Sequence, residues 1–121
     1  MIEVMDLDSA ILYTNNIAKI REFYEKTVGL TCEYQEGNVY VSFIFPSGAR
    51  LGINKSVLLP REKPGGQTFF IRTPDIDKEY KKYEKLGYKF YEPYNKFNWG
   101  TYFAILDPDG NKVGFIQPPN Y

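Results

Sequence analysis

The chain has 121 residues, 43% of them hydrophobic and 17% aromatic, and its 15 Lys and Arg balance its 15 Asp and Glu. This size predicts one globular domain over residues 1–121, and the balanced charge gives no field that attracts nucleic acid or a membrane surface. Residues 1–8 are acidic and no stretch of the sequence approaches transmembrane length, so we expect a cytoplasmic protein. Histidine is absent, which removes the commonest transition-metal ligand and general base.

The first half of the chain is predicted to form four strands and one helix. The run Ser9–Thr14 has strand composition. After it, Asn15 or Asn16 caps a helix over residues 17–27, where apolar residues recur at helical spacing, and Gly29 ends it. Further strands are expected at residues 30–34, 39–45 and 50–54, separated by turns at 36–38 and 46–48. The predicted order is β-α-β-β-β.

The second half is predicted to repeat this order after a linker rich in Pro and Gly at residues 55–66. A strand at Thr68–Arg72 leads to a helix over residues 76–86, which Asp75 caps and Gly87 ends. A strand at residues 88–91 and an aromatic loop at 94–100 follow. The chain closes with a hairpin of strands 102–106 and 112–117 around the turn at residues 107–110, where Gly110 supplies the positive φ of a tight reversal.

The two halves correspond at nearly constant offsets in the sequence. Ser9 matches Thr68 and Asn16 matches Asp75 at an offset of 59, and Gly48 matches Gly110 and Gly52 matches Gly114 at 62. This duplication of residues 8–55 in 67–118, together with the DPDGN turn, resembles the vicinal oxygen chelate superfamily, which includes glyoxalase I, bleomycin resistance proteins, fosfomycin resistance enzymes and extradiol dioxygenases.

The resemblance implies an α+β fold in which tandem βαβββ modules form a partly open mixed β-barrel around a concave site. In that family two chains commonly pair to complete the site. We therefore expect a homodimer that takes a small-molecule ligand.

Metal-binding members of the family hold the ion with two histidines and with glutamates at defined positions. The matching positions in this sequence are Ser9, Thr68, Gly52 and Gly114. Two hydroxyls and two hydrogens do not supply the donor atoms that such a metal needs, so we expect neither a metal nor another cofactor. The two glycines indicate either a close backbone approach or a cavity widened by the missing side chains.

Candidate ligand-binding residues come from the aromatic segment 90–102 and from strand alternation. We expect Trp99 and Tyr102 to pack in the core or an interface, or to line a ligand. If the family's site positions Ser9, Gly52, Thr68 and Gly114 face the concave side of the sheets, strand alternation places further residues on the same side. These are Tyr13, Arg50, Asn54, Phe70, Arg72 and Lys112, and both groups are candidate ligand-binding residues. The three basic residues among them suit an anionic ligand, unless they are paired with Asp or Glu.

Three functions are consistent with these features. The first is a metal-independent protein that resembles bleomycin resistance proteins and sequesters an aromatic or anionic small molecule, as in antibiotic resistance. The second is a glyoxalase-like lyase or isomerase, or a dioxygenase-family enzyme, with non-standard site residues. The third is a structural or regulatory module without a ligand. The missing histidines favour the first over the second.

Overall fold

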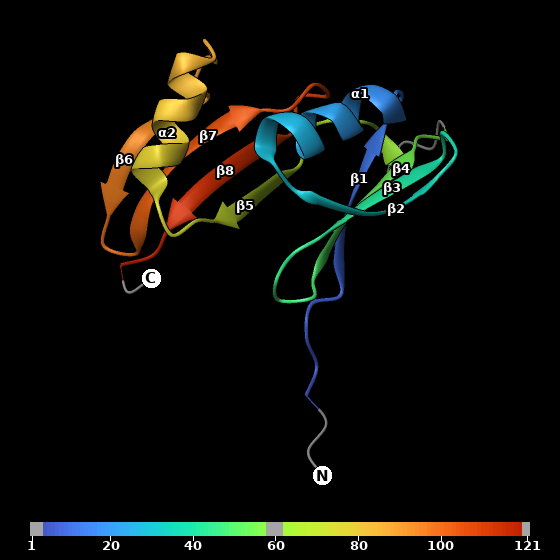
Figure 1. Ribbon diagram of the computed structural model, residues 1–121, viewed down its shortest axis with the longest axis horizontal. Helices are drawn as coiled ribbons and strands as arrows, with labels where there is room; N and C mark the ends of the chain where they lie inside the picture. The colour runs from blue at the N-terminus through green and yellow to red at the C-terminus, as the bar shows by residue number, and fades with distance from the viewer. Residues whose placement is uncertain (1–3, 58–61, 120–121) are drawn as a thin grey trace. The chain divides into compact units, whose positions relative to one another are not determined.

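The computed structural model describes residues 4–57 and 62–119, which fall into two compact units, Met1–Gly65 and Gly66–Tyr121. Figure 1 shows that each unit contains one sheet of four strands and one helical region. Across the described residues, no helix is long and apolar enough to cross a membrane.

The first unit is a β-α-β-β-β module. Its elements are β1 (Ser9–Thr14), α1 (Ile17–Glu22), η1 (Phe23–Val28), β2 (Thr31–Glu36), β3 (Tyr40–Ile44) and β4 (Arg50–Lys55). The strands form a mixed sheet in the order β1-β4-β3-β2, in which β1 runs parallel to β4 and the other pairs are antiparallel.

The second unit repeats this arrangement. Its elements are β5 (Thr68–Arg72), α2 (Ile76–Lys85), β6 (Glu92–Phe97), β7 (Gly100–Leu106) and β8 (Lys112–Gln117). The sheet order is β5-β8-β7-β6, again with one parallel pair at β5 and β8. The predicted α+β fold of tandem βαβββ modules is confirmed.

The two helical regions begin and end on the residues that the sequence indicates. The Asn16 side chain accepts a hydrogen bond from the Lys19 backbone N–H at 3.0 Å, and Asp75 does the same for Lys78 at 3.1 Å. Each region ends where a glycine adopts the left-handed conformation. The first region is π-helical in its second half, because Tyr24 accepts bonds from the N–H groups of residues 29 and 30.

Each sheet buries one face under the helix of its own unit. In the first unit Tyr24 is fully buried and its ring lies 5.9 Å from that of Phe43. In the second unit Tyr83 is the equivalent residue at an offset of 59, and its ring lies 5.1 Å from that of Phe115. Burying an apolar side chain such as Phe43 or Phe115 in this way stabilises the fold by about 1.5 to 3 kcal/mol. The opposite face, called the helix-free face below, therefore contributes little to the core.

The DPDGN turn carries a buried polar network. Asp107 Oδ1 accepts hydrogen bonds from the backbone N–H groups of Asp109 and Asn111, both at 2.9 Å, while its Oδ2 accepts one from Asn111 Nδ2. Asn111 Oδ1 in turn accepts a bond from the Gln67 N–H at 3.1 Å. This chain of bonds ties the β7–β8 hairpin to the residue that precedes β5.

The predicted strand at residues 88–91 is wrong. Tyr88 instead closes the end of α2, since its N–H donates to the Tyr83 carbonyl at 3.0 Å. The Phe90 ring then packs on Tyr80 at 4.7 Å and on Phe103 at 5.5 Å. Sheet pairing begins at Glu92 and becomes regular from Asn95, after a register shift between these two residues.

The sixth strand therefore occupies most of the segment that was expected to be an aromatic loop. It contains Pro93, which is tolerated because β6 is an edge strand and needs no donor on its open side. β1, β5 and β8 match their predicted bounds, and the other elements differ by one or two residues. Of the predicted linker, residues 58–61 lie outside the part that the structure describes.

The substitution Asn111→Ala is expected to lower the free energy of unfolding by about 2 to 3 kcal/mol. The reason is that Asp107 Oδ2 and the Gln67 N–H both lose their buried partner. Chemical denaturation measures the change. Asn98→Ala, at an exposed turn residue, is the matched control and should change stability by less than about 0.5 kcal/mol. Equal effects of the two substitutions would contradict a structural role for the network.

Candidate functional site

The strand positions predicted to bind a ligand all lie on the helix-free face of their own sheet. Their register places Ser9 beside Arg50 and Tyr13 beside Asn54 in the first unit. In the second unit the pairs are Thr68 with Lys112, Phe70 with Gly114, and Arg72 with Ile116. The alternate residues, such as Leu51 and Val113, are buried under the helices. Ligand binding by this set stays a prediction.

Side chains from neighbouring strands cover the two glycines at the family's glutamate positions. A Cβ added at Gly52 would lie 2.7 Å from Tyr40 Oη and 2.8 Å from Ile11 Cδ1. A Cβ at Gly114 would lie 2.7 Å from Cδ2 of Phe70. These three distances are shorter than ordinary contacts of a carbon atom. Side chains rather than another backbone segment therefore fill the space that a side chain at residue 52 or 114 would take.

The residues around these glycines do not fit the family's metal. Ser9 and Thr68 offer only hydroxyl groups, and the sequence has no histidine. Within residues 4–57 and 62–119, no group of three Cys, Asp or Glu side chains is placed to hold an ion. A carboxylate at residue 52 or 114 would also have to displace the side chains that now cover those positions.

Two of the three basic candidates are paired with carboxylates on the same face. Arg50 donates to Glu33 through Nε at 2.6 Å and through Nη2 at 3.1 Å. The hydrogen bond from Arg50 lowers the pKa of Glu33. At the equivalent place in the second unit, Lys112 pairs with Glu92. The paired alternative therefore holds for Arg50 and Lys112.

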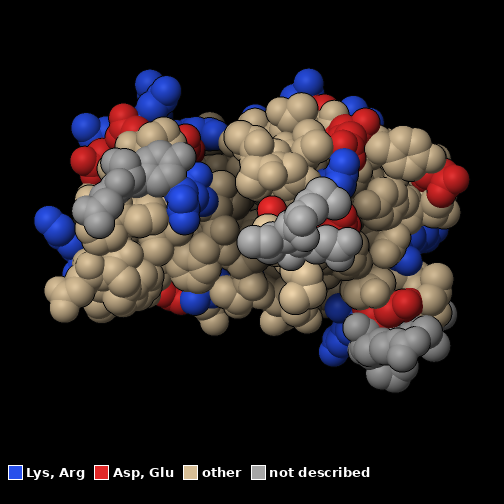
Figure 2. Space-filling model, turned by 90° about the horizontal axis from the view of Figure 1, so that it is seen from below, with Lys and Arg blue, Asp and Glu red and all other residues tan. Residues whose placement is uncertain are grey.

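These pairs reflect a wider mixing of charge. On the face that Figure 2 shows, Lys and Arg side chains lie interspersed with Asp and Glu among the other residues.

Three exposed aromatic residues of the second unit and the half-buried Tyr102 form a continuous group, called the aromatic surface below: Phe70, Phe97, Trp99 and Tyr102. The rings of Phe97 and Trp99 are parallel within 1° and their centroids are 5.3 Å apart. Tyr102 lies 5.2 Å from Trp99 and 5.5 Å from both Phe97 and Phe70. Trp99 nevertheless keeps 54% of its surface exposed. The surface therefore presents a ring to which a planar group can stack.

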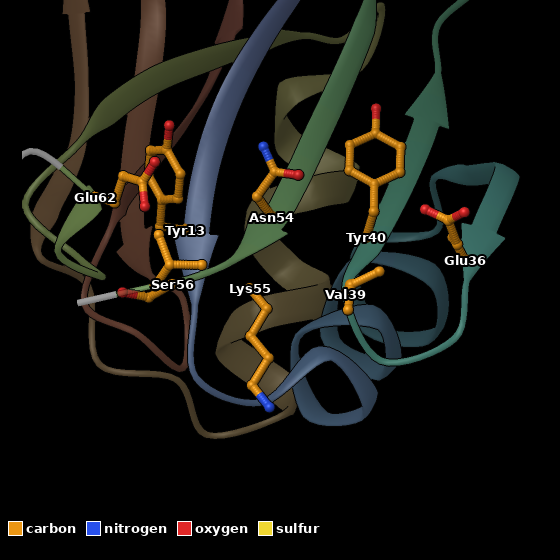
Figure 3. Close-up of a pocket in the computed structure, with 9 residues that line it drawn as sticks. Tyr13, Glu36, Val39, Tyr40, Asn54, Lys55, Ser56 and Glu62 are labelled. Carbon is orange, nitrogen blue, oxygen red and sulfur yellow. The ribbon is translucent and has the colours of Figure 1, made fainter. Parts of the chain in front are cut away.

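The first unit contains a pocket of about 530 Å³ at the ends of β1, β4 and β3. Figure 3 shows Tyr13 and Tyr40 on either side of Asn54, with all three side chains pointing the same way and the Lys55 side chain pointing elsewhere. The remaining lining residues are Glu36, Val39, Ser56, Val57 and Glu62. Two tyrosines, an amide and two carboxylates thus line one pocket.

A second pocket, of about 540 Å³, lies beside the start of α2 in the second unit. Tyr94 Oη donates a 2.6 Å hydrogen bond to Asp77 Oδ1 at its wall, and this bond raises the pKa of Tyr94.

Comparison with known proteins identifies the family. The model of the Glyoxalase/Bleomycin resistance protein/Dioxygenase superfamily matches residues 6–115. The chain belongs to this superfamily. A search of curated proteins gives no significant match.

Solved structures with a similar fold include proteins whose names indicate different activities. TnmS3, an antibiotic binding protein from Streptomyces sp. CB03234, has a TM-score of 0.79 and 23% identity over 98% of this chain and 99% of its own. Lactoylglutathione lyase from Agrobacterium tumefaciens has a TM-score of 0.77 and 21% identity over 93% of this chain and 92% of its own. Virulence protein STM3117 from Salmonella typhimurium has a TM-score of 0.80 and 19% identity over 97% of this chain and 99% of its own. At these identities the similarity shows the fold alone.

Of the residues that line the first pocket, the sequence predicted only Tyr13 and Asn54. The residues it missed include Glu36, Tyr40 and Glu62. Tyr40 lies in the predicted third strand, but which face it takes depends on the register between strands, and Glu36 lies in the predicted turn at residues 36–38. Glu62 lies in the predicted linker, where no periodic pattern indicates a direction.

The substitution Gly114→Ala is expected to lower the free energy of unfolding by about 1 to 2 kcal/mol, because the new methyl group must push the Phe70 ring out of its contact with Tyr102. Thermal or chemical denaturation measures this effect. In a Phe70→Ala background the same substitution should cost less than about 0.5 kcal/mol. Equal costs in the two backgrounds would show that Phe70 is not the obstacle.

Proposed function

We propose that this superfamily member binds a planar aromatic small molecule on the aromatic surface, without a metal ion. The main support for this proposal is the stack of Phe97, Trp99 and Tyr102, in which Trp99 remains more than half exposed. Exposing such a group of rings to water is unfavourable, so a ligand that covers the rings is stabilised in the complex.

The near-parallel rings favour a flat ligand over a globular one. The interplanar angles are 1° between Phe97 and Trp99 and 24° between Trp99 and Tyr102, so a flat ligand parallel to one of these rings is nearly parallel to the others. Each additional aromatic contact contributes about 0.5 to 1.5 kcal/mol beyond the area it buries.

Charge on the helix-free faces gives weaker support to an anionic ligand. Arg50 and Lys112 already hold carboxylates of their own sheets, so an anion would have to compete with Glu33 or Glu92. We therefore propose the aromatic class of ligand rather than the anionic one.

Binding without catalysis is favoured by the donor groups of the site. The side chains at the family's ligand positions lack imidazole and carboxylate groups, so they offer neither a metal set nor a strong base. Binding a small molecule, as the name of the antibiotic binding protein TnmS3 indicates for that protein, requires only a contact area between the protein and the ligand. The proposal is therefore sequestration, as in antibiotic resistance.

Trp99 is the only tryptophan of the chain, so intrinsic fluorescence reports directly on the proposed contact. We expect that some members of a panel of planar polycyclic antibiotics quench this fluorescence saturably and raise the melting temperature. Trp99→Ala should then weaken binding, measured by titration calorimetry, by about 1 to 3 kcal/mol, because the ligand loses a stacking ring but no charge is left unpaired.

The matched control is Tyr91→Ala. Tyr91 is as exposed as Trp99, at 59%, and lies outside the aromatic surface in the same unit. It should leave the affinity within about twofold. An unchanged affinity in the Trp99 variant, or an equal loss in both variants, would contradict the proposal.

We also propose that the protein is a homodimer. The helix-free faces expose large apolar side chains outside the aromatic surface, such as Ile11, Tyr34 and Leu106, which a second copy would cover. Light scattering coupled to size-exclusion chromatography at tens of micromolar should give twice the chain mass of 14.1 kDa. A mass of one chain under these conditions would contradict the dimer.

A further inference from the structure

Four residues of the pocket in the first unit lie on one line across the sheet. Tyr13 on β1 pairs with Asn54 on β4, Asn54 pairs with Tyr40 on β3, and Tyr40 pairs with Glu36 on β2. Because paired residues of neighbouring strands point to the same face, their side chains rise from the sheet side by side. The functional groups of these side chains are, in order across the sheet, a phenol, an amide, a phenol and a carboxylate.

The spacing of this line leaves room for one small group between the two phenol rings. Tyr13 and Tyr40 are two strands apart, which separates their backbones by roughly 9 to 10 Å. Asn54, between them, has a much shorter side chain and forms the floor (Figure 3). A small group that enters above Asn54, such as an ammonium or guanidinium group, therefore contacts both tyrosine side chains.

Acidic side chains outnumber basic ones in the lining of the pocket. Glu36 and Glu62 line it together with Lys55, whose exposed side chain points away from the tyrosines in Figure 3. Glu62 Oε2 is buried and lacks a hydrogen-bond partner among the described residues. A carboxylate oxygen withdrawn from water in this way is stabilised when a cationic donor approaches it.

We propose that this pocket binds an organic cation, such as an alkylammonium or alkylguanidinium group, between Tyr13 and Tyr40. The two phenol faces attract the positive charge through their π systems, and Glu62 accepts a hydrogen bond from its N–H groups. Asn54 contributes an amide oxygen as a further acceptor at the floor. The site is independent of the aromatic surface, because all of its residues belong to the first unit.

The experiment uses n-butylammonium as the probe and n-butanol as its uncharged isostere. Each is titrated into the full-length ¹⁵N-labelled protein, and the side-chain amide of Asn54 and the backbone amides of residues 13, 36 and 40 are followed by NMR. The cation should shift these signals saturably, whereas butanol at equal concentration should not. Equal shifts by both compounds would overturn the proposal, because they would indicate a purely apolar pocket.

Variants assign the effect to the named groups. Glu62→Gln and Tyr13→Leu should each weaken n-butylammonium binding by about fivefold or more. Glu22→Gln removes an exposed carboxylate of α1 outside the pocket and should leave the affinity within about twofold. An equal loss in Glu22→Gln and Glu62→Gln would reduce the effect to general electrostatics and overturn the assignment. Trp99 fluorescence should not respond to the probe, which separates this test from that of the aromatic surface.

Discussion

Each sheet of this protein buries only one of its faces under a helix, and strand alternation sends every second residue to the other face. The packing of that helix-free face depends on two glycines, Gly52 and Gly114, which let neighbouring side chains lie directly on the sheet. Tyr40 and Ile11 cover the first glycine, and Phe70 covers the second. Because Phe70 also contacts Tyr102, the absence of a side chain at residue 114 allows the aromatic surface to begin in the middle of its sheet.

The duplicated modules retain the same construction but carry different chemistry. Both place a basic residue against a glutamate at the equivalent position, as Arg50 with Glu33 and as Lys112 with Glu92. Beyond that shared pair, the first module lines a pocket with tyrosines and carboxylates, whereas the second exposes a stack of rings. Superfamily members that bind metals draw their ligands from both modules. In this chain the matching positions have no such donors, so each module is free to form its own contact surface.

Much of the fold could be predicted because its signals are local. Helix caps, the glycines that end the helices and the DPDGN turn each act within a few residues, and their repetition reveals the duplication. The β6 strand escaped prediction because Pro93 disfavours a strand except at a sheet edge, and edge position is set by tertiary pairing. The pocket residues Tyr40 and Glu36 and the Glu33 partner of Arg50 depend on register across strands, which one segment of sequence does not specify.

We propose that packed rings and ion pairs occupy the positions at which other members of the superfamily hold a metal. Elemental analysis of the protein, purified without added metal and again after incubation with zinc or nickel and removal of the excess, is the decisive measurement. We expect far less than one equivalent of either metal per chain, and no turnover of methylglyoxal with glutathione. One tightly held equivalent, lost together with activity on chelation, would contradict the proposal.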